Sequence, residues 1–214
     1  MKQLGVLGGT FDPIHYGHLV AADAAAEALN LDRVLFVPCG QPPHRPAGES
    51  TPAEHRYLMT VLATAGHPRF RVSRMELDRA GPSYTVDTLA ALRRQLGPGI
   101  DLTFIVGADA FLLMDQWKDP ERIMELAMIT VVSRPGYNDG AVEARLRALP
   151  ESLRVRVRHL EIDPLNISAR ELRRRLREGR SVRYLIPPQV LAYIEQHGLY
   201  RGENVQLLEQ KPPC

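Results

Sequence analysis

The sequence of 214 residues has little of several features that would indicate a particular class of protein. Its only cysteines, Cys39 and Cys214, form no CxxC pair, so neither a disulfide framework nor a zinc knuckle is indicated. No run approaches eighteen apolar residues, which argues against a membrane-spanning helix. The first apolar run is followed by no small-residue cleavage site, so we expect no signal peptide. These absences favour a soluble, reduced, cytoplasmic protein without a membrane partner.

A large excess of charge of one sign is also absent. The chain has 27 Lys and Arg against 25 Asp and Glu, a net charge of +2, and nucleic-acid binding usually needs a broader positive surface. We therefore expect no nucleic-acid partner. Positive charge gathers only at 170–183, where Arg174, Arg175 and Arg177 are interpreted as a solvated helix face. With 44% hydrophobic and 24% charged residues, the chain is typical of a globular protein.

Strand-like and helix-like segments alternate along nearly the whole chain. Apolar or alternating runs predict six strands, at 2–7, 33–38, 70–77, 101–107, 128–134 and 154–162. Helical spacing predicts five helices, at 18–30, 51–66, 85–97, 168–179 and 187–198. Two of these helices begin with capping-box patterns, formed by Thr51 with Glu54 and by Ser168 with Glu171.

This alternation predicts an α/β fold with a doubly wound, mostly parallel sheet of the Rossmann-like type. In such sheets ligands bind beyond the carboxyl ends of the strands, where the strand order reverses. Four groups of special residues directly follow predicted strands, at 8–18, 40–45, 107–109 and 133–134. We therefore expect these groups to meet in one ligand site.

The chain is long enough for one domain with a full core, and we assign that domain to residues 1–200. Its last part, from about residue 165 to residue 200, is predicted to be a small helical subregion. The tail at 201–214 has no convincing pattern, and we expect it to be disordered.

The first group, GGTFDPIHYGH at 8–18, combines a glycine turn with two histidines three residues apart. It matches neither GxGxxG nor GxxxxGK[ST]. A glycine turn nevertheless lets backbone approach a phosphate, and a following helix aims free N–H groups at that phosphate. His15 and His18 would share one face of this helix. Three interpretations stay open: a metal site, structural capping of the turn, or an anion site where both imidazoles donate hydrogen bonds.

The same stretch resembles the N-terminal signature of the nucleotidylyltransferase superfamily, whose HxGH motif would be filled by His15, Gly17 and His18. Later segments resemble those of bacterial nicotinate-nucleotide adenylyltransferases. These segments are PPHR at 42–45, SYTVDTL at 83–89, GADAFLLMDQW at 107–117, SRPGY at 133–137, ISARELR at 167–173 and YLIPPQVLAYIEQHGLY at 184–200. The resemblance covers residues 2–200, and SYTVDTL with the Trp after GAD points to the pyridine-nucleotide branch.

What the resemblance implies is adenylyl transfer in NAD biosynthesis, in which the phosphate of nicotinate mononucleotide attacks the α-phosphorus of ATP and pyrophosphate leaves. Positioning and charge stabilisation would carry the catalysis. The attacking phosphate is already ionised at neutral pH, so no general base is required. Since no aspartate cluster indicates a metal site built by the protein, we expect Mg²⁺ to be bound through the ATP phosphates.

The resemblance implies that His15 and His18 are catalytic, because they would hold the ATP phosphates and stabilise the transition state. The implied ATP-binding residues are Gly8, Gly9, Thr10, Phe11, His15, His18, Gly107, Asp109, Arg134, Ile167, Ser168 and Arg173. Asp109 also fits a helix N-cap. Arg170 stands where the motif usually has a hydroxyl residue, so one hydroxyl contact is in doubt and a cation is added.

A second set of residues is implied for nicotinate mononucleotide, namely Thr10, Phe11, His44, Arg45, Tyr84, Thr85 and Trp117. Trp117 would stack on the pyridine ring, although a sole Trp is also typical of a core. Thr85 and backbone N–H groups would face the nicotinate carboxylate. His44 and Arg45, in a Pro- and Gly-rich segment, would close over the phosphates or form a solvated charged pair.

Other functions stay open. Within the class, the chain would adenylylate another phosphorylated substrate, nicotinamide mononucleotide or phosphopantetheine. Two alternatives come from other classes of protein. One is a nucleotide sensor without catalysis, and the intact His15 and His18 argue against it. The other is an RNA-binding module, and the near-neutral net charge argues against it. The sequence leaves open the oligomeric state, a homo-oligomer included, and how strictly acid is preferred over amide.

Overall fold

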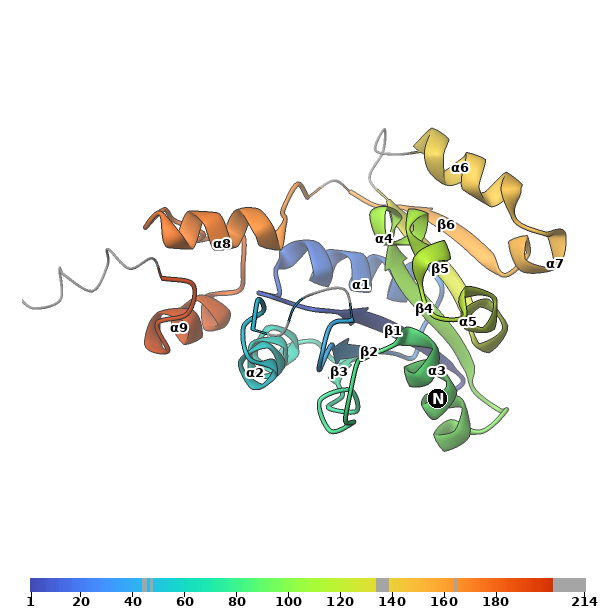
Figure 1. Cartoon of the computed structure of the whole chain (residues 1–214), viewed down its shortest axis with the longest axis horizontal. Helices are drawn as coiled ribbons and strands as arrows, with labels where there is room; N and C mark the ends of the chain where they lie inside the picture. Colours follow the sequence, from blue (N-terminus) through green and yellow to red (C-terminus); the bar gives the residue numbers. More distant parts are fainter. Residues whose placement is uncertain (44–45, 47, 134–138, 164, 202–214) are drawn as a thin grey trace, which may run out of the picture.

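The computed structural model describes residues 1–43, 46, 48–133, 139–163 and 165–201. Six strands form one sheet in the order β3-β2-β1-β4-β5-β6, and every neighbouring pair is parallel (Figure 1). The strands are β1 Gln3–Gly9, β2 Arg33–Pro38, β3 Phe70–Val72, β4 Asp101–Gly107, β5 Met128–Ser133 and β6 Val157–Glu161. The predicted doubly wound, Rossmann-like sheet is confirmed, and its strand order reverses between β1 and β4.

Helices connect successive strands and follow the last one. They are α1 Tyr16–Ala28, α2 Ala53–Thr64, α3 Thr85–Leu96, α4 Ala108–Leu112, the 3₁₀ turn η1 Met114–Gln116, α5 Pro120–Leu126, α6 Asp139–Ala148, α7 Glu151–Arg154, α8 Ala169–Arg177 and α9 Pro188–Gln196. The last two helices form the helical part expected after β6, and Figure 1 shows them at the same end of the molecule as α2. Among the described residues, no helix is both long and apolar enough to cross a membrane.

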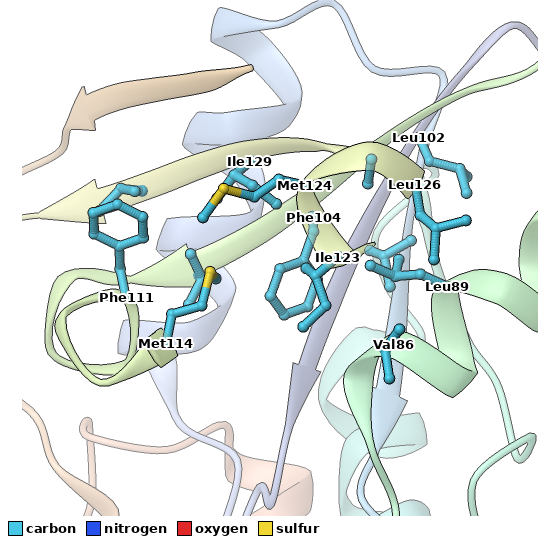
Figure 2. Packing of buried hydrophobic residues seen from close by; sticks show 14 of the residues in the cluster. Val86, Leu89, Leu102, Phe104, Phe111, Met114, Ile123, Met124, Leu126 and Ile129 are labelled. Atoms are coloured by element: carbon cyan, nitrogen blue, oxygen red, sulfur yellow. The ribbon is translucent and has the colours of Figure 1, made fainter. Parts of the chain in front are cut away.

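The period of two residues along each strand sends alternate side chains to opposite faces of the sheet. In β4, Leu102, Phe104 and Val106 pack with α3, α4 and α5, whereas Ile105 packs on the other face with α1. Figure 2 shows Phe104 beside Ile123 of α5 in the first of these clusters. Both faces are covered by helices, which explains the nearly continuous apolar runs of the central strands.

The structure corrects the predicted elements at several positions. β3 is limited to Phe70–Val72 and β6 to Val157–Glu161, both shorter than the runs at 70–77 and 154–162. Four short helices, α4 to α7, are also absent from the sequence prediction. With 4 to 10 residues each, they offer few periodic positions from which helical spacing can be recognised.

The predicted capping box at the start of α2 is wrong. The N-cap is Pro52, and no side chain caps the helix. The N–H of Thr51 instead donates to Asp12 Oδ2 at 3.4 Å, and the carboxylate of Glu54 pairs with Arg74 at 2.6 Å. Long-range partners have therefore taken the groups that would have made the local cap.

At the start of α8, the serine half of the predicted capping box is present. Ser168 is the N-cap, and its Oγ accepts a hydrogen bond from the N–H of Glu171 at 3.3 Å. The carboxylate of Glu171 pairs with Arg174 at 2.8 Å and with Arg175 at 3.1 Å. These two arginines therefore belong to an ion-paired outer face of α8, as expected for a solvated charge run.

Candidate active site

A cavity of about 390 Å³ opens at the carboxyl ends of β1, β4 and β5, beside the point where the strand order reverses. Among the residues predicted to bind ATP, it is lined by His15, His18, Gly107, Asp109, Ile167 and Ser168. Three of the four groups expected to meet here do so, since Ser133 also lines the cavity. The described part of the fourth group, residues 40–43, does not line it.

The two histidines are stacked at the start of α1. His15 is the N-cap of the helix and His18 lies in its first turn, with ring centroids 3.7 Å apart and an interplanar angle of 23°. Nδ1 of His18 accepts a hydrogen bond from the N–H of His15 at 3.3 Å. In the neutral tautomer that this bond requires, the proton of His18 is on Nε2, which can donate to an anion.

Gly17 makes room for this stacked arrangement. A Cβ at position 17 would lie 3.0 Å from Nδ1 and 3.1 Å from Cε1 of His15, tighter than ordinary packing allows. Within the described residues, the buried Nδ1 of His15 has no hydrogen-bond partner. The HxGH spacing therefore serves a specific geometry, in which a bare backbone at the third position lets the first imidazole lie flat against the second.

Burial keeps both imidazoles neutral. It lowers the pKa of His15 from 6.5 to about 4. The pKa of His18 is also well below its usual value, because of burial and because of the positive charge that a protonated His15 would place beside it. At pH 7 the pair therefore presents neutral N–H donors to the cavity.

This burial predicts that acid weakens the fold. Because the folded pKa of His15 is below its ordinary value of 6.5, the unfolded chain takes up a proton between pH 6.5 and 4 that the folded chain does not. Lowering the pH from 7.5 to 5 should reduce the free energy of unfolding by about 2 kcal/mol more in the wild type than in His15→Gln. Urea unfolding at both pH values measures the difference, and equal losses in the two proteins would contradict it.

The turn between β1 and α1, residues 10–15, is called the signature turn, and it is largely buried. Phe11, only 2% exposed and with a φ of 49°, packs its ring edge-on against His18 at 5.1 Å and near Phe36. A Cβ on Gly9 would lie 2.9 Å from the ring of Phe11, so this ring covers the backbone of Gly9. The side chain of Phe11 is therefore part of the core that supports the turn, so any contact of Phe11 with a ligand would be made by its backbone.

Two predicted ATP-binding residues have positions that the sequence did not suggest. Gly107, and not Asp109, is the N-cap of α4, and Asp109 lies exposed in its first turn at the rim of the cavity. Arg173 Nη1 donates at 2.6 Å to the backbone carbonyl of Asp12. Arg173 therefore supports the signature turn from behind, in addition to any contact with a ligand.

Three of the residues predicted to bind the pyridine nucleotide, Tyr84, Thr85 and Trp117, lie outside this cavity, on or beside the start of α3. Tyr84 is the N-cap of α3, which begins at Thr85, and among the described residues no side-chain cap is present at this helix start. Lys118 Nζ lies 4.8 Å from the centroid of the Tyr84 ring and bonds Asp87 at 3.1 Å, which holds the segment after Trp117 against α3. An open helix N-terminus beside aromatic rings can accept an anionic planar group.

Trp117 is half-buried, and its predicted stacking on the pyridine ring stays a prediction. It packs on the core cluster beneath α3, with its ring edge-on to Phe104 at 6.1 Å and 72°. Phe104 is in turn close to Gly8, where a Cβ would lie 3.7 Å from the Phe104 ring. Trp117 is thereby connected through one aromatic ring to the end of β1.

Comparison with known proteins places this geometry in a family. The family model described as cytidylyltransferase-like matches residues 6–175. A protein of Thermus thermophilus, named as a probable nicotinate-nucleotide adenylyltransferase, is 53% identical over 199 residues, which are 93% of this chain and 100% of the relative. The chain belongs to the nicotinate-nucleotide adenylyltransferase family. A relative of the same name from Moorella thermoacetica is 46% identical over 199 residues, covering 93% of this chain and 92% of its own.

A solved structure shares the fold of this family member. Plasmodium falciparum nicotinic acid mononucleotide adenylyltransferase complexed with NaAD aligns with a TM-score of 0.73 and 20% identity, covering 94% of this chain and 98% of its own. At this identity the likeness supports the architecture and not individual contacts.

Several buried residues that hold the signature turn in place were not predicted from the sequence. Arg56, Asp12 and Tyr200 are buried or partly buried and bond to the turn or to one another, with the hydroxyl of Tyr200 donating to Asp12 Oδ1 at 2.6 Å. A signal for Arg56 was available, because it shares the helical face of Met59 that the pattern of α2 predicts to be buried. Three predicted site residues, His44, Arg45 and Arg134, lie outside the described part of the chain.

Proposed function

We propose that the protein transfers the adenylyl group of ATP to nicotinate mononucleotide, giving nicotinate adenine dinucleotide and pyrophosphate. The single observation that carries this proposal is the neutral, stacked pair of His15 and His18 in a cavity at the switch point of the sheet. Relatives 46% to 53% identical over 93% of the chain are named for this activity, which supports the choice of reaction.

On this proposal ATP occupies the cavity. Its phosphates lie against the imidazoles and the N-terminus of α8 at Ser168, where backbone N–H groups and the helix dipole favour negative charge. The adenosine lies toward Ile167 and the turn after β4, and the backbone of 8–11 approaches the phosphates. We also assign Arg134 to the binding of these phosphates, because it directly follows β5 in the sequence.

Nicotinate mononucleotide lies on the other side of the signature turn. Its carboxylate meets the N-terminus of α3 at Thr85, and its ring lies against Tyr84 and Trp117. Thr10 and Phe11 face both nucleotides through their backbone. His44 and Arg45 are assigned to its phosphate, to which both side chains can donate hydrogen bonds.

The chemistry follows from these positions. An oxygen of the mononucleotide phosphate attacks the α-phosphorus of ATP, the bond from that phosphorus to the α–β bridging oxygen breaks, and pyrophosphate leaves with the electron pair. The N–H donors of His15 and His18 stabilise the charge that grows on the phosphate oxygens. No side chain has to remove a proton, because the attacking phosphate is ionised.

We assign the metal to the substrate. Among the described residues, no group of three or more His, Cys, Asp or Glu side chains could hold a metal ion, and Asp109 is the only carboxylate that lines the cavity. Mg²⁺ would therefore arrive on the ATP phosphates, where it neutralises charge on pyrophosphate as it leaves. The cytoplasmic location and the absence of a nucleic-acid partner stay predictions of the sequence, and the oligomeric state, a homo-oligomer included, stays open.

A substrate panel tests the proposal. The wild-type protein should release pyrophosphate from Mg-ATP with nicotinate mononucleotide, and at a rate at least about 100-fold lower with phosphopantetheine, whose chain has no ring or carboxylate for the α3 site. Nicotinate riboside, which lacks the attacking phosphate, is the matched control and should give no product. Faster release with phosphopantetheine would identify a different adenylyl acceptor, and no release with any acceptor would indicate a nucleotide sensor.

A further inference from the structure

Arg56 of α2 has the largest side chain among the fully buried residues, with 1% exposure. A guanidinium withdrawn from water is costly unless its N–H groups are hydrogen-bonded. Its Nε donates to the carbonyl oxygen of Thr51 at 2.7 Å, its Nη1 to that of Thr10 at 2.8 Å and its Nη2 to that of Gly40 at 3.0 Å. Because the guanidinium is planar and rigid, these bonds fix the three backbone segments relative to one another.

Two of these segments are the turns that follow neighbouring strands. Thr10 belongs to the signature turn after β1, and Gly40 to the turn after β2, and the strand ends are already joined by a bond from Cys39 N–H to the Gly9 carbonyl at 2.9 Å. On its other side, Gly40 has no room for a side chain. A Cβ there would lie 2.2 Å from the carbonyl oxygen of Glu76.

From Gly40 the connection continues to the N-terminus of α3. The N–H groups of Gly40 and Gln41 donate to Ser83 Oγ at 3.1 and 3.2 Å, and the Ser83 N–H donates to the Gln41 carbonyl at 2.9 Å. Ser83 directly precedes the residues assigned above to the pyridine ring. A continuous series of hydrogen bonds therefore leads from the signature turn through Arg56 to the start of α3.

We propose that Arg56 is a positioning residue that sets the spacing between the ATP half and the pyridine half of the site. It acts through the carbonyls of Thr10 and Gly40. Attack on the α-phosphorus requires the two nucleotides in a near-attack arrangement, and a misplacement of about 1 Å can reduce the rate by about 100-fold. This inference rests on the proposed function, because the two halves are those of adenylyl transfer.

Arg56→Lys is the decisive variant. It keeps the positive charge but replaces the planar fork with one flexible ammonium, which cannot hold three separate carbonyls in the same geometry. We expect kcat per folded active site to fall by about 10- to 100-fold, with the KM of each nucleotide changed by less than about threefold. Folded sites are counted by ATP-binding stoichiometry, at a temperature well below the Tm of the variant.

Arg93 provides a matched control. It also joins two backbone segments, donating from Nε to the Leu126 carbonyl at 2.8 Å and from Nη1 to the Ile100 carbonyl at 2.5 Å, but near the amino end of β4. Arg93→Lys should lower Tm while leaving kcat per folded site within about twofold of the wild type. Loss of activity by general destabilisation would affect both variants alike.

A binding measurement tests the spacing between the two halves of the site independently of catalysis. Nicotinate adenine dinucleotide spans both halves of the site, so its Kd depends on their separation, whereas ATP or nicotinate mononucleotide alone each report on one half. In Arg56→Lys, the Kd of nicotinate adenine dinucleotide should rise about tenfold more than the Kd of ATP or the Kd of nicotinate mononucleotide. A kcat like that of the wild type, or an equal loss of affinity for all three ligands, would overturn the positioning role. A wild-type protein that binds none of the three would overturn the proposed function itself.

Discussion

Replacing His18 with alanine is expected to lower kcat for adenylyl transfer by about 10²–10³, while the Kd of ATP changes far less. Nδ1 of His18 is occupied by the N–H of His15, so Nε2 is its donor. A neutral donor already in place does not have to reorganise when charge grows on the phosphate oxygens, and such donors are among the largest contributors to catalysis. Burial supplies the neutral state by lowering the pKa of both histidines.

His18→Asn separates support of the turn from catalysis. The asparagine oxygen can replace Nδ1 as acceptor for the His15 N–H, but nothing replaces Nε2, so this variant should lose kcat nearly as much as alanine. His67→Ala is the control, because His67 is also stacked on a ring at 3.7 Å, that of Phe70, away from the cavity. More than about a third of the wild-type kcat in His18→Ala would remove His18 from the mechanism.

A preference for nicotinate over nicotinamide mononucleotide of at least about tenfold in kcat/KM is the second expected result. Among the described residues no side-chain cap is present at the N-terminus of α3, so its first N–H groups can donate to an acceptor. In the proposed complex the Thr85 hydroxyl donates to the nicotinate carboxylate. A carboxylate only accepts hydrogen bonds, whereas an amide brings two N–H donors that would face these donors. The helix dipole adds to the preference for negative charge.

Steady-state kinetics with the acid and the amide, at saturating Mg-ATP, measure this preference. Trp117→Ala should raise the KM for the pyridine nucleotide more than that for ATP, because Trp117 is assigned to the pyridine ring and not to the cavity. Trp117→Phe keeps an aromatic plane and should recover most of the loss. Equal kcat/KM for acid and amide would contradict the assignment of the carboxylate to α3, although adenylyl transfer itself would stand.

Local patterns predicted the central sheet because its strands are buried on both faces. β2 and β4 have the predicted bounds, and Ser168 caps α8 as its sequence indicates. The HxGH spacing likewise predicted that His15 and His18 would share one site. In these cases the sequence pattern that indicates the structure lies within a few residues along the chain.

Predictions failed where long-range partners decide the local structure. Thr51 is not the N-cap of α2, and its N–H and carbonyl bond to Asp12 and to the guanidinium of Arg56. Arg173 matches a phosphate-binding motif, and its ATP contact stays a prediction, but the motif gave no indication of its bond to the Asp12 carbonyl, 161 residues away in the chain. No local pattern encodes such contacts, since they depend on how α2 and α8 are brought to the end of β1.

ATP labelled at the α-phosphorus tests most directly which bond the protein breaks. With nicotinate mononucleotide and Mg²⁺, we expect the label to appear in nicotinate adenine dinucleotide, in an amount equal to the unlabelled pyrophosphate released. Without the mononucleotide, the label should stay in ATP. Label found in AMP or ADP without dinucleotide, or dinucleotide formed without equal pyrophosphate, would contradict adenylyl transfer at this site.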